Sequence, residues 1–233
     1  MRRSFVILIA ALTVFITLST QTEVKGVMFA IDPSKTALII VDMQNDFVRE
    51  GAVAYVPDAV KTIPNHQNLI NVCREKKIPI FYTKFIAPPV RTTWTEFSKV
   101  LVDPPKNLLL RGFRRYYSDA KKELDVGEIV DELAPKPGDI VIEKQSYDGF
   151  FDTPLASYLK ARGVKYVLIT GTVTEICVEA TTKGAYFRQF YPVVVSDAVS
   201  AMDAEAAKVV LKLLNRRFAR VATTSEVIGE LGK

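Results

Sequence analysis

The chain has 233 residues, of which 48% are hydrophobic and 24% are charged, and its formal net charge is +5 at pH 7. This length and apolar content can bury the core of one large domain, and no repeat, low-complexity tract or long linker divides the chain into two. The positive charge is modest, and the densest basic stretches, at 111–115 and 215–220, lack the interleaved aromatic residues of a nucleic-acid groove. We therefore expect no nucleic-acid partner.

The chain begins with Arg2 and Arg3, an apolar run at 5–18 and a polar stretch at 19–26. This order is typical of a secretory signal, and the run is short for a membrane-spanning helix. We expect residues 1–27 to be a signal peptide or an N-terminal anchor, so that the protein is exported or tethered to a membrane through this segment alone, and residues 28–233 to form the domain. In the alternative, translation starts at Met28 and the protein is cytoplasmic.

Runs rich in Val and Ile recur along the chain, and the predicted strands are 36–41, 79–85, 139–143, 166–170, 191–196 and 220–223. Helical periodicity predicts helices at 58–77, 154–162, 175–189, 204–215 and 225–231. Several strands are apolar on consecutive residues, which indicates burial on both faces. The alternation predicts an α/β fold, a three-layer, doubly wound, mostly parallel six-stranded sheet with helices on both faces. Residues 91–117 fit no pattern, and we interpret them as an excursion near the site or a subunit contact.

The only two cysteines, Cys73 and Cys177, cannot supply a disulfide framework. Cys73 lies among apolar residues in a helical pattern, where we expect a core position. The single histidine, His66, lies near the start of the same helix, and we expect it to be exposed or to cap that helix. One histidine excludes any metal site built from a histidine cluster.

Three reactive side chains follow predicted strands. Asp42 follows strand 36–41, Lys144 follows strand 139–143, and Cys177 comes after strand 166–170 at the start of a helical pattern. The carboxyl ends of parallel strands meet at one edge of a sheet, where ligands bind, so we expect these groups at one edge. At a helix start, unpaired N–H groups and the positive end of the helix dipole favour a thiolate.

Each of the three has a structural alternative. Asp42 can cap a turn, Lys144 can be a surface lysine, and Cys177 can be a small apolar residue that packs a helix onto the sheet. The presence of all three at one edge favours a catalytic role over these structural ones, because an ammonium stabilises the ionised forms of an acid and a thiol beside it.

Three segments carry a resemblance to a known family. They are ALIIVDMQNDF at 37–47, PGDIVIEKQSYDGFFDTPL at 137–155 and TGTVTEICVE at 170–179. In this order they resemble the isochorismatase-like cysteine hydrolases, which include nicotinamidases, N-carbamoylsarcosine amidases, biuret hydrolases and ureidoacrylate amidohydrolases. The resemblance runs from residue 31 to residue 231.

This resemblance implies that Asp42, Lys144 and Cys177 form a catalytic triad that cleaves its substrate through a thioester. It also implies a cis peptide between Thr172 and Val173, and an oxyanion hole made by the backbone N–H groups of Val173 and Cys177. The family further implies a small-molecule substrate and a homo-oligomer, either a dimer or a tetramer.

Departures from the family pattern narrow the chemistry. Residues 82–88 read YTKFIAP where nicotinamidases carry an Asp-x-His and further metal-binding histidines, so we expect no metal and no cofactor. Isochorismatases proper generally lack the cysteine, so Cys177 favours a carbon–nitrogen bond. We expect hydrolysis of a small amide, ureido or carbamoyl substrate, and the segment 147–155 is most similar to the ureidoacrylate and carbamoyl amidohydrolases. The alternatives are an isochorismatase-type hydrolase of another small molecule and a non-catalytic small-molecule-binding family member.

The remaining predictions concern the pocket. We expect Gln44, Phe47, Tyr147 and Phe150 to contact the substrate, while the three aromatic residues also fit core positions. Glu175 stands where many relatives have asparagine and adds an acid near the site.

Overall fold

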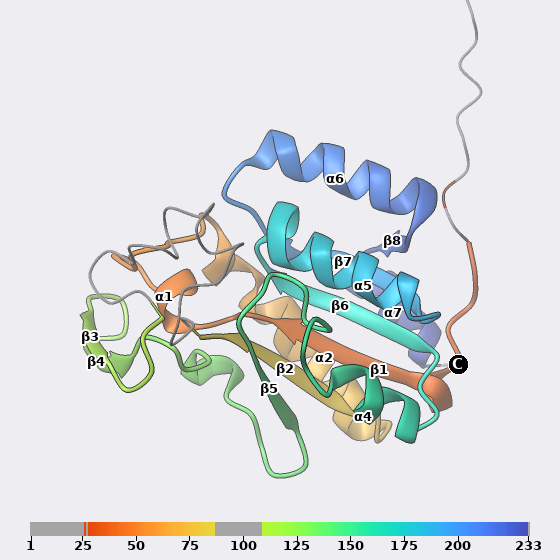
Figure 1. Cartoon of the computed structure of the whole chain (residues 1–233), viewed down its shortest axis with the longest axis horizontal. Coiled ribbons are helices and arrows are strands. Elements are labelled where there is room, and N and C mark those ends of the chain that lie inside the picture. The colour runs from red at the N-terminus through yellow and green to blue at the C-terminus, as the bar shows by residue number, and fades with distance from the viewer. Residues whose placement is uncertain (1–25, 27, 87–108, 233) are drawn as a thin grey trace, which may run out of the picture.

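The computed structural model describes residues 26, 28–86 and 109–232. Its centre is a six-stranded sheet in the order β5-β2-β1-β6-β7-β8, in which every neighbouring pair of strands is parallel (Figure 1). This confirms the predicted sheet. The strands are β1 (Thr36–Val41), β2 (Ile80–Phe85), β5 (Ile140–Lys144), β6 (Tyr166–Thr172), β7 (Tyr191–Ser200) and β8 (Arg220–Ala222).

The central strands are buried on both faces, as their consecutive apolar residues predict. Every residue of β1 and β2 is buried. Side chains alternate across a strand, so Leu38 and Ile40 of β1 enter one core while Ala37, Ile39 and Val41 enter the other. The sheet therefore needs helices on both of its faces.

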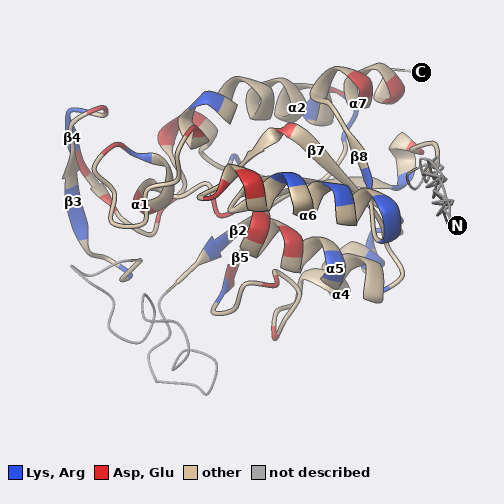
Figure 2. Ribbon diagram, turned by 90° about the horizontal axis from the view of Figure 1, so that it is seen from above, with Lys and Arg blue, Asp and Glu red and all other residues tan. Residues whose placement is uncertain are grey.

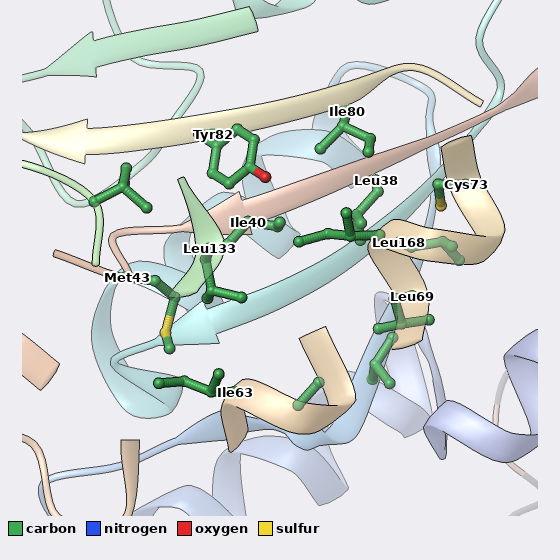
Figure 3. Packing of buried hydrophobic residues seen from close by; sticks show 14 of the residues in the cluster. Leu38, Ile40, Met43, Ile63, Leu69, Cys73, Ile80, Tyr82, Leu133 and Leu168 are labelled. Atoms are coloured by element: carbon green, nitrogen blue, oxygen red, sulfur yellow. The ribbon is translucent and has the colours of Figure 1, made fainter. Parts of the chain in front are cut away.

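Helices supply that cover (Figure 2). α2 (Ile63–Glu75) and α7 (Thr224–Leu231) pack on one face, and α4 (Leu155–Ala161), α5 (Glu179–Phe187) and α6 (Ala204–Arg217) pack on the other. In the first core, Leu69 and Cys73 of α2 lie against Leu38 and Ile40 of β1 and Leu168 of β6 (Figure 3). The predicted core position of Cys73 is confirmed.

Several short helical elements were not predicted, or replace the first turn of a predicted helix. They are η1 (Pro33–Lys35), α1 (Asn45–Val48), η2 (Ala59–Thr62), η4 (Asp131–Leu133) and η5 (Thr174–Val178). The predicted helix at 58–77 starts only at Ile63, because Asp58 is left-handed (φ 62°) and a 3₁₀ turn follows it. Pro64 then occupies the first turn of α2, where its missing N–H costs no hydrogen bond. The predicted helix at 175–189 begins as the π-helical turn η5 and becomes α-helical at Glu179.

The expectation that His66 is exposed or a cap is wrong. The side chain is fully buried within α2, and its Nδ1 lies 2.9 Å from the carbonyl oxygen of Thr62. Burial lowers the pKa of His66 to about 4, so the ring is neutral at pH 7.

A hairpin of β3 (Arg114–Tyr117) and β4 (Lys122–Asp125) was not predicted, because its strands are short and largely polar. Asp46 of α1 attaches it to the domain. The buried Oδ1 of Asp46 accepts hydrogen bonds from the Tyr117 hydroxyl at 2.7 Å and from Arg115 Nε at 3.1 Å. The described part of the unassigned segment 91–117 thus leads into a hairpin fixed to the loop that follows β1.

The predicted signal or anchor segment lies outside the described residues, apart from Gly26. Within residues 26, 28–86 and 109–232, no helix has the length and apolar content that crossing a membrane requires.

Candidate active site

The three predicted reactive groups meet at the carboxyl edge of the sheet. Asp42 directly follows β1, Lys144 is the last residue of β5, and Cys177 lies in η5 just after β6. Lys144 Nζ lies 2.7 Å from Asp42 Oδ2, and neither side chain is exposed to solvent. The thiol of Cys177 lies within hydrogen-bonding reach of both. An acid, an ammonium and a thiol from three distant segments therefore share one buried site.

Asp42 is held by its backbone and by Thr83. Its φ of 51° is left-handed, a conformation that aspartate tolerates better than most residues. Its N–H donates to the carbonyl of Thr83 at 3.2 Å, and the Thr83 hydroxyl donates to its Oδ1 at 2.6 Å. Oδ2 accepts no well-aligned hydrogen bond from the described residues, although Lys144 is in ion-pair contact with it. One carboxylate oxygen is thus fixed, and the other faces the ammonium.

Lys144 is surrounded by groups that keep it charged. Its Nζ donates to the carbonyls of Ser146 at 2.9 Å and Tyr147 at 3.3 Å, and it lies 4.7 Å from the ring centroid of Phe85. Burial alone would lower the pKa of Lys144, but the negative charge of Asp42 and the neighbouring Cys177 more than offset it, so the pKa is raised. Lys144 is an ammonium at neutral pH.

The turn that carries Cys177 depends on Gly171. Its φ of 106° is left-handed, and a Cβ at this position would lie 2.0 Å from the carbonyl oxygen of Val41. Only glycine allows β6 to approach β1 so closely before the chain turns. The peptide between Thr172 and Val173 is cis, which confirms the expectation from the resemblance.

Hydrogen bonds fix the shape of the same turn. The carbonyl of Val173 accepts from the N–H groups of Ile176 at 3.1 Å and Val178 at 3.0 Å. The Thr174 hydroxyl donates to the carbonyl of Ser200 at 2.9 Å, which ties the turn to the end of β7.

The position of Cys177 at the start of a helical segment does not make it a thiolate at neutral pH. Burial raises its pKa to about 12, because the site excludes water and Asp42 offsets part of the stabilisation by Lys144. Burial also raises the pKa of Cys73 to about 12. The two thiols therefore differ in their neighbours, since Cys177 alone lies beside an acid and an ammonium, and Cys73 is packed in an apolar core.

A model of the isochorismatase domain matches residues 36–226. The chain belongs to the isochorismatase family. The matched region extends from β1 to the first turn of α7 and contains all three groups of the site.

Relatives of known name include amidohydrolases. The ureidoacrylate amidohydrolase RutB of Caulobacter segnis is 30% identical over 222 residues, which cover 87% of this chain and 88% of the relative. A cysteine hydrolase from Pseudomonas syringae pv. phaseolicola superposes with a TM-score of 0.79 at 26% identity, covering 89% of this chain and 97% of that one. The N-carbamoylsarcosine amidase from Thermoplasma acidophilum superposes with a TM-score of 0.65 at 28% identity, and the match covers 82% of this chain and 96% of the amidase. The chain is an isochorismatase-like hydrolase with amidohydrolases among its relatives.

The four residues predicted to contact substrate lie in different environments. In this family member Gln44 is buried, and its side-chain amide binds backbone groups: Nε2 donates to the carbonyls of Phe85 and Gly127, and Oε1 accepts from the N–H of Phe85. Gln44 thus joins the loop after β1 to the end of β2 and to the loop after β4. This polar side chain has a structural task that its position in the sequence did not reveal.

The three aromatic residues divide between the two cores and the site. Phe47 is packed in the same core as α2, and Phe150 stacks on Phe190 in the core on the opposite face of the sheet, with centroids 5.8 Å apart. Tyr147 is only partly buried, and its carbonyl accepts a hydrogen bond from Lys144. Tyr147 is therefore the one of the four that lies beside the reactive groups and keeps some exposure.

Glu175 connects the turn to α6. Its Oε1 accepts from the backbone N–H groups of Met202 and Asp203, each at 2.9 Å. Asp203 in turn caps α6 by accepting from Glu205 and Ala206. The acid two residues before Cys177 therefore holds the loop between β7 and α6 against the turn.

Among residues 26, 28–86 and 109–232, no three His, Cys, Asp or Glu side chains lie close enough together to hold a metal ion.

Proposed function

We propose that this isochorismatase-family protein is a cysteine-dependent amidohydrolase, which cleaves a C–N bond of a small amide, ureido or carbamoyl substrate through a thioester. Asp42, Lys144 and Cys177 would be its catalytic residues. The observation that carries the proposal is the placement of a neutral thiol beside an ion-paired carboxylate in one buried site.

The first step is a proton transfer. A thiol whose pKa is about 12 cannot attack as a thiolate at neutral pH without a base, and Asp42 is the acidic group within its reach. Thr83 occupies Oδ1, so Oδ2 is the oxygen that would take the proton from Cys177. Lys144 stays charged throughout and stabilises the negative charge as it moves from the carboxylate to sulfur.

The thiolate then attacks the carbonyl carbon and forms a C–S bond, and the carbonyl oxygen becomes an oxyanion. The N–H groups of Val173 and Cys177 would bind that oxyanion. Each donor of an oxyanion hole stabilises the transition state of acyl transfer by about 3 kcal/mol. The rigid turn between Gly171 and Val178 supports this role, because a donor helps most when it needs no reorganisation.

Collapse of the tetrahedral intermediate breaks the C–N bond, and protonated Asp42 returns its proton to the departing nitrogen. Water then attacks the thioester with Asp42 as the base, which releases the acid or carbamate and restores the thiol. Because the three groups are coupled, the apparent pKa values of the pH–rate profile belong to the set.

The relatives support a substrate class. RutB acts on ureidoacrylate by its name, and the amidase from Thermoplasma acidophilum acts on N-carbamoylsarcosine. Both substrates carry a terminal –CO–NH₂ group on nitrogen, so we propose ureido and N-carbamoyl acids as the first compounds to test.

The experiment is a screen for ammonia release from ureido acids, N-carbamoyl amino acids and simple primary amides. The wild-type protein is expected to hydrolyse at least one compound, and Cys177→Ala is expected to lose that activity, while Cys73→Ala retains it as the matched control. Full activity in Cys177→Ala would refute the nucleophile. Specific binding of a compound without its turnover would support the non-catalytic alternative.

A further inference from the structure

A patch of exposed aromatic residues lies at the end of the sheet opposite the candidate active site. Parallel strands begin at this end, and α5 and α6 finish there (Figure 1). We call it the aromatic patch. It consists of Met28, Phe29, Tyr186, Phe187, Tyr191 and Phe218, which together line most of a groove of about 420 Å³. Phe187 is 66% exposed, Tyr191 50% and Tyr186 43%. A contiguous apolar surface of this kind marks an interaction site more often than scattered single residues do.

The rings of the patch are fixed by one another. Phe218 lies 5.3 Å from Tyr186 and 6.1 Å from Phe187 between ring centroids, and Phe29 lies 5.4 Å from Tyr191. Each of these three pairs meets edge-on, a favourable geometry for aromatic rings. The exposed rings are therefore part of the packed domain, and the surface is presented in a defined shape.

Unpaired cations border the patch. Arg216 and Arg217 form the last turn of α6 directly before Phe218, and Lys165 precedes Tyr166, whose ring lies 5.4 Å from that of Tyr191. All three cations are exposed, and none has a carboxylate partner in the described part of the chain. Figure 2 shows Lys and Arg at the end of α6 and Asp and Glu at its start, which is the end toward the candidate active site. Aromatic rings bordered by Lys and Arg are the composition that favours the interface of an anionic membrane.

The position of the N-terminal apolar run also favours a membrane as the partner of the patch. Met28 and Phe29 belong to the patch, and the apolar run at 5–18, preceded by Arg2 and Arg3, ends ten residues before Met28. Ten extended residues span at most about 35 Å, so a membrane that binds the apolar run would lie within that distance of the patch. An apolar run of that kind enters lipid readily.

We propose that the aromatic patch rests on the surface of an anionic lipid bilayer. Tyr186, Phe187 and Tyr191 would enter the headgroup layer, while Arg216 and Arg217 contact lipid phosphates. The candidate active site lies at the other edge of the sheet and so faces the water, where a small polar substrate can reach it. This proposal does not depend on the reaction that the site performs.

Co-sedimentation of the full chain with vesicles tests the proposal. The wild-type protein is expected to bind mixed phosphatidylcholine–phosphatidylglycerol vesicles and to bind pure phosphatidylcholine vesicles much less. Replacing both cations in Arg216→Gln/Arg217→Gln is expected to lower the partition coefficient for the anionic vesicles about tenfold or more. Phe187→Ser removes the most exposed ring and is expected to lower it severalfold.

Matched controls sit at the other end of the molecule. Arg114→Gln/Lys121→Gln removes the same charge from the hairpin of β3 and β4, and Tyr116→Ser removes a ring of the same hairpin that is 62% exposed. Both are expected to bind like the wild type. Equal binding by the wild type and the patch variants, or an equal loss in the hairpin control, would overturn the proposal. So would a change from oligomer to monomer in Phe187→Ser without vesicles, because the patch would then be a contact between copies of the chain.

Discussion

Thr83→Val tests how the candidate base is held. The substitution keeps the shape of the side chain in the fully buried strand β2 and removes only the hydroxyl that donates to Asp42 Oδ1 at 2.6 Å. A hydrogen bond to a charged group contributes about 1.5–3 kcal/mol. We therefore expect the free energy of unfolding at pH 7 to fall by about 2 kcal/mol.

The same change is expected to reduce turnover. Without the Thr83 hydroxyl, no side chain of the described residues donates a hydrogen bond to Oδ1, and the carboxylate can rotate so that Oδ2 no longer faces Lys144 and Cys177. A loss of about 2 kcal/mol in the transition state corresponds to a decrease of about thirtyfold in kcat/KM.

The assay combines urea unfolding with initial rates on whichever compound the ammonia screen identifies. Thr83→Ser, which retains the hydroxyl, is the control and is expected to keep most of the activity. If Thr83→Val matched the wild type in both measurements, the hydrogen bond to Asp42 would have no part in the site, and the reasoning from its geometry would be refuted.

Three further outcomes follow from buried groups. Gly171→Ala should lower the free energy of unfolding by more than about 3 kcal/mol, because the added Cβ would overlap a backbone carbonyl of β1. The control Gly163→Ala, which has a left-handed φ but open space around it, should lower the free energy of unfolding by about 1 kcal/mol. Equal losses of stability in the two variants, measured by thermal melting, would contradict this. Lys144→Met should destabilise the protein by about 3–5 kcal/mol because it leaves the charge of Asp42 buried and unpaired, and Lys144→Met/Asp42→Asn should recover part of that loss in the same urea assay. The pKa of His66 in the folded protein is about 4, below its ordinary value of 6.5, so the unfolded chain binds more protons than the folded chain between these two pH values. The free energy of unfolding should therefore fall by up to about 3 kcal/mol as the pH drops from 6.5 to 4. A His66→Gln variant whose free energy of unfolding depends on pH in the same way would contradict this.

Much of the architecture could be predicted because burial on both faces leaves a clear trace in sequence. Consecutive apolar residues in β1 and β7 indicate a covered parallel sheet, and the carboxyl ends of such strands indicate where reactive groups gather. Asp42, Lys144 and Cys177 could be singled out on that basis, since each follows or ends a recognisable strand.

The supporting residues could not be predicted, because their tasks depend on contacts across the fold. Thr83 reads as an ordinary strand residue until its hydroxyl is placed against Asp42, and Gln44 reads as a polar pocket residue until its amide is placed against backbone groups of β2. The hairpin of β3 and β4 is short and polar, and it is attached by Asp46 from a distant part of the chain. The ionisation of Cys177 likewise depends on its burial, which outweighs its place at the start of a helical segment.

The most direct measurement is the mass of the Cys177 peptide after acid quenching during turnover of an active ureido or carbamoyl substrate. The proposed thioester predicts that this peptide gains the mass of the acyl or carbamoyl group, and that the peptide of Cys73 gains nothing. A protein that turns over rapidly in the steady state, shows no adduct on Cys177 at any quench time and retains its activity as Cys177→Ala would contradict the mechanism.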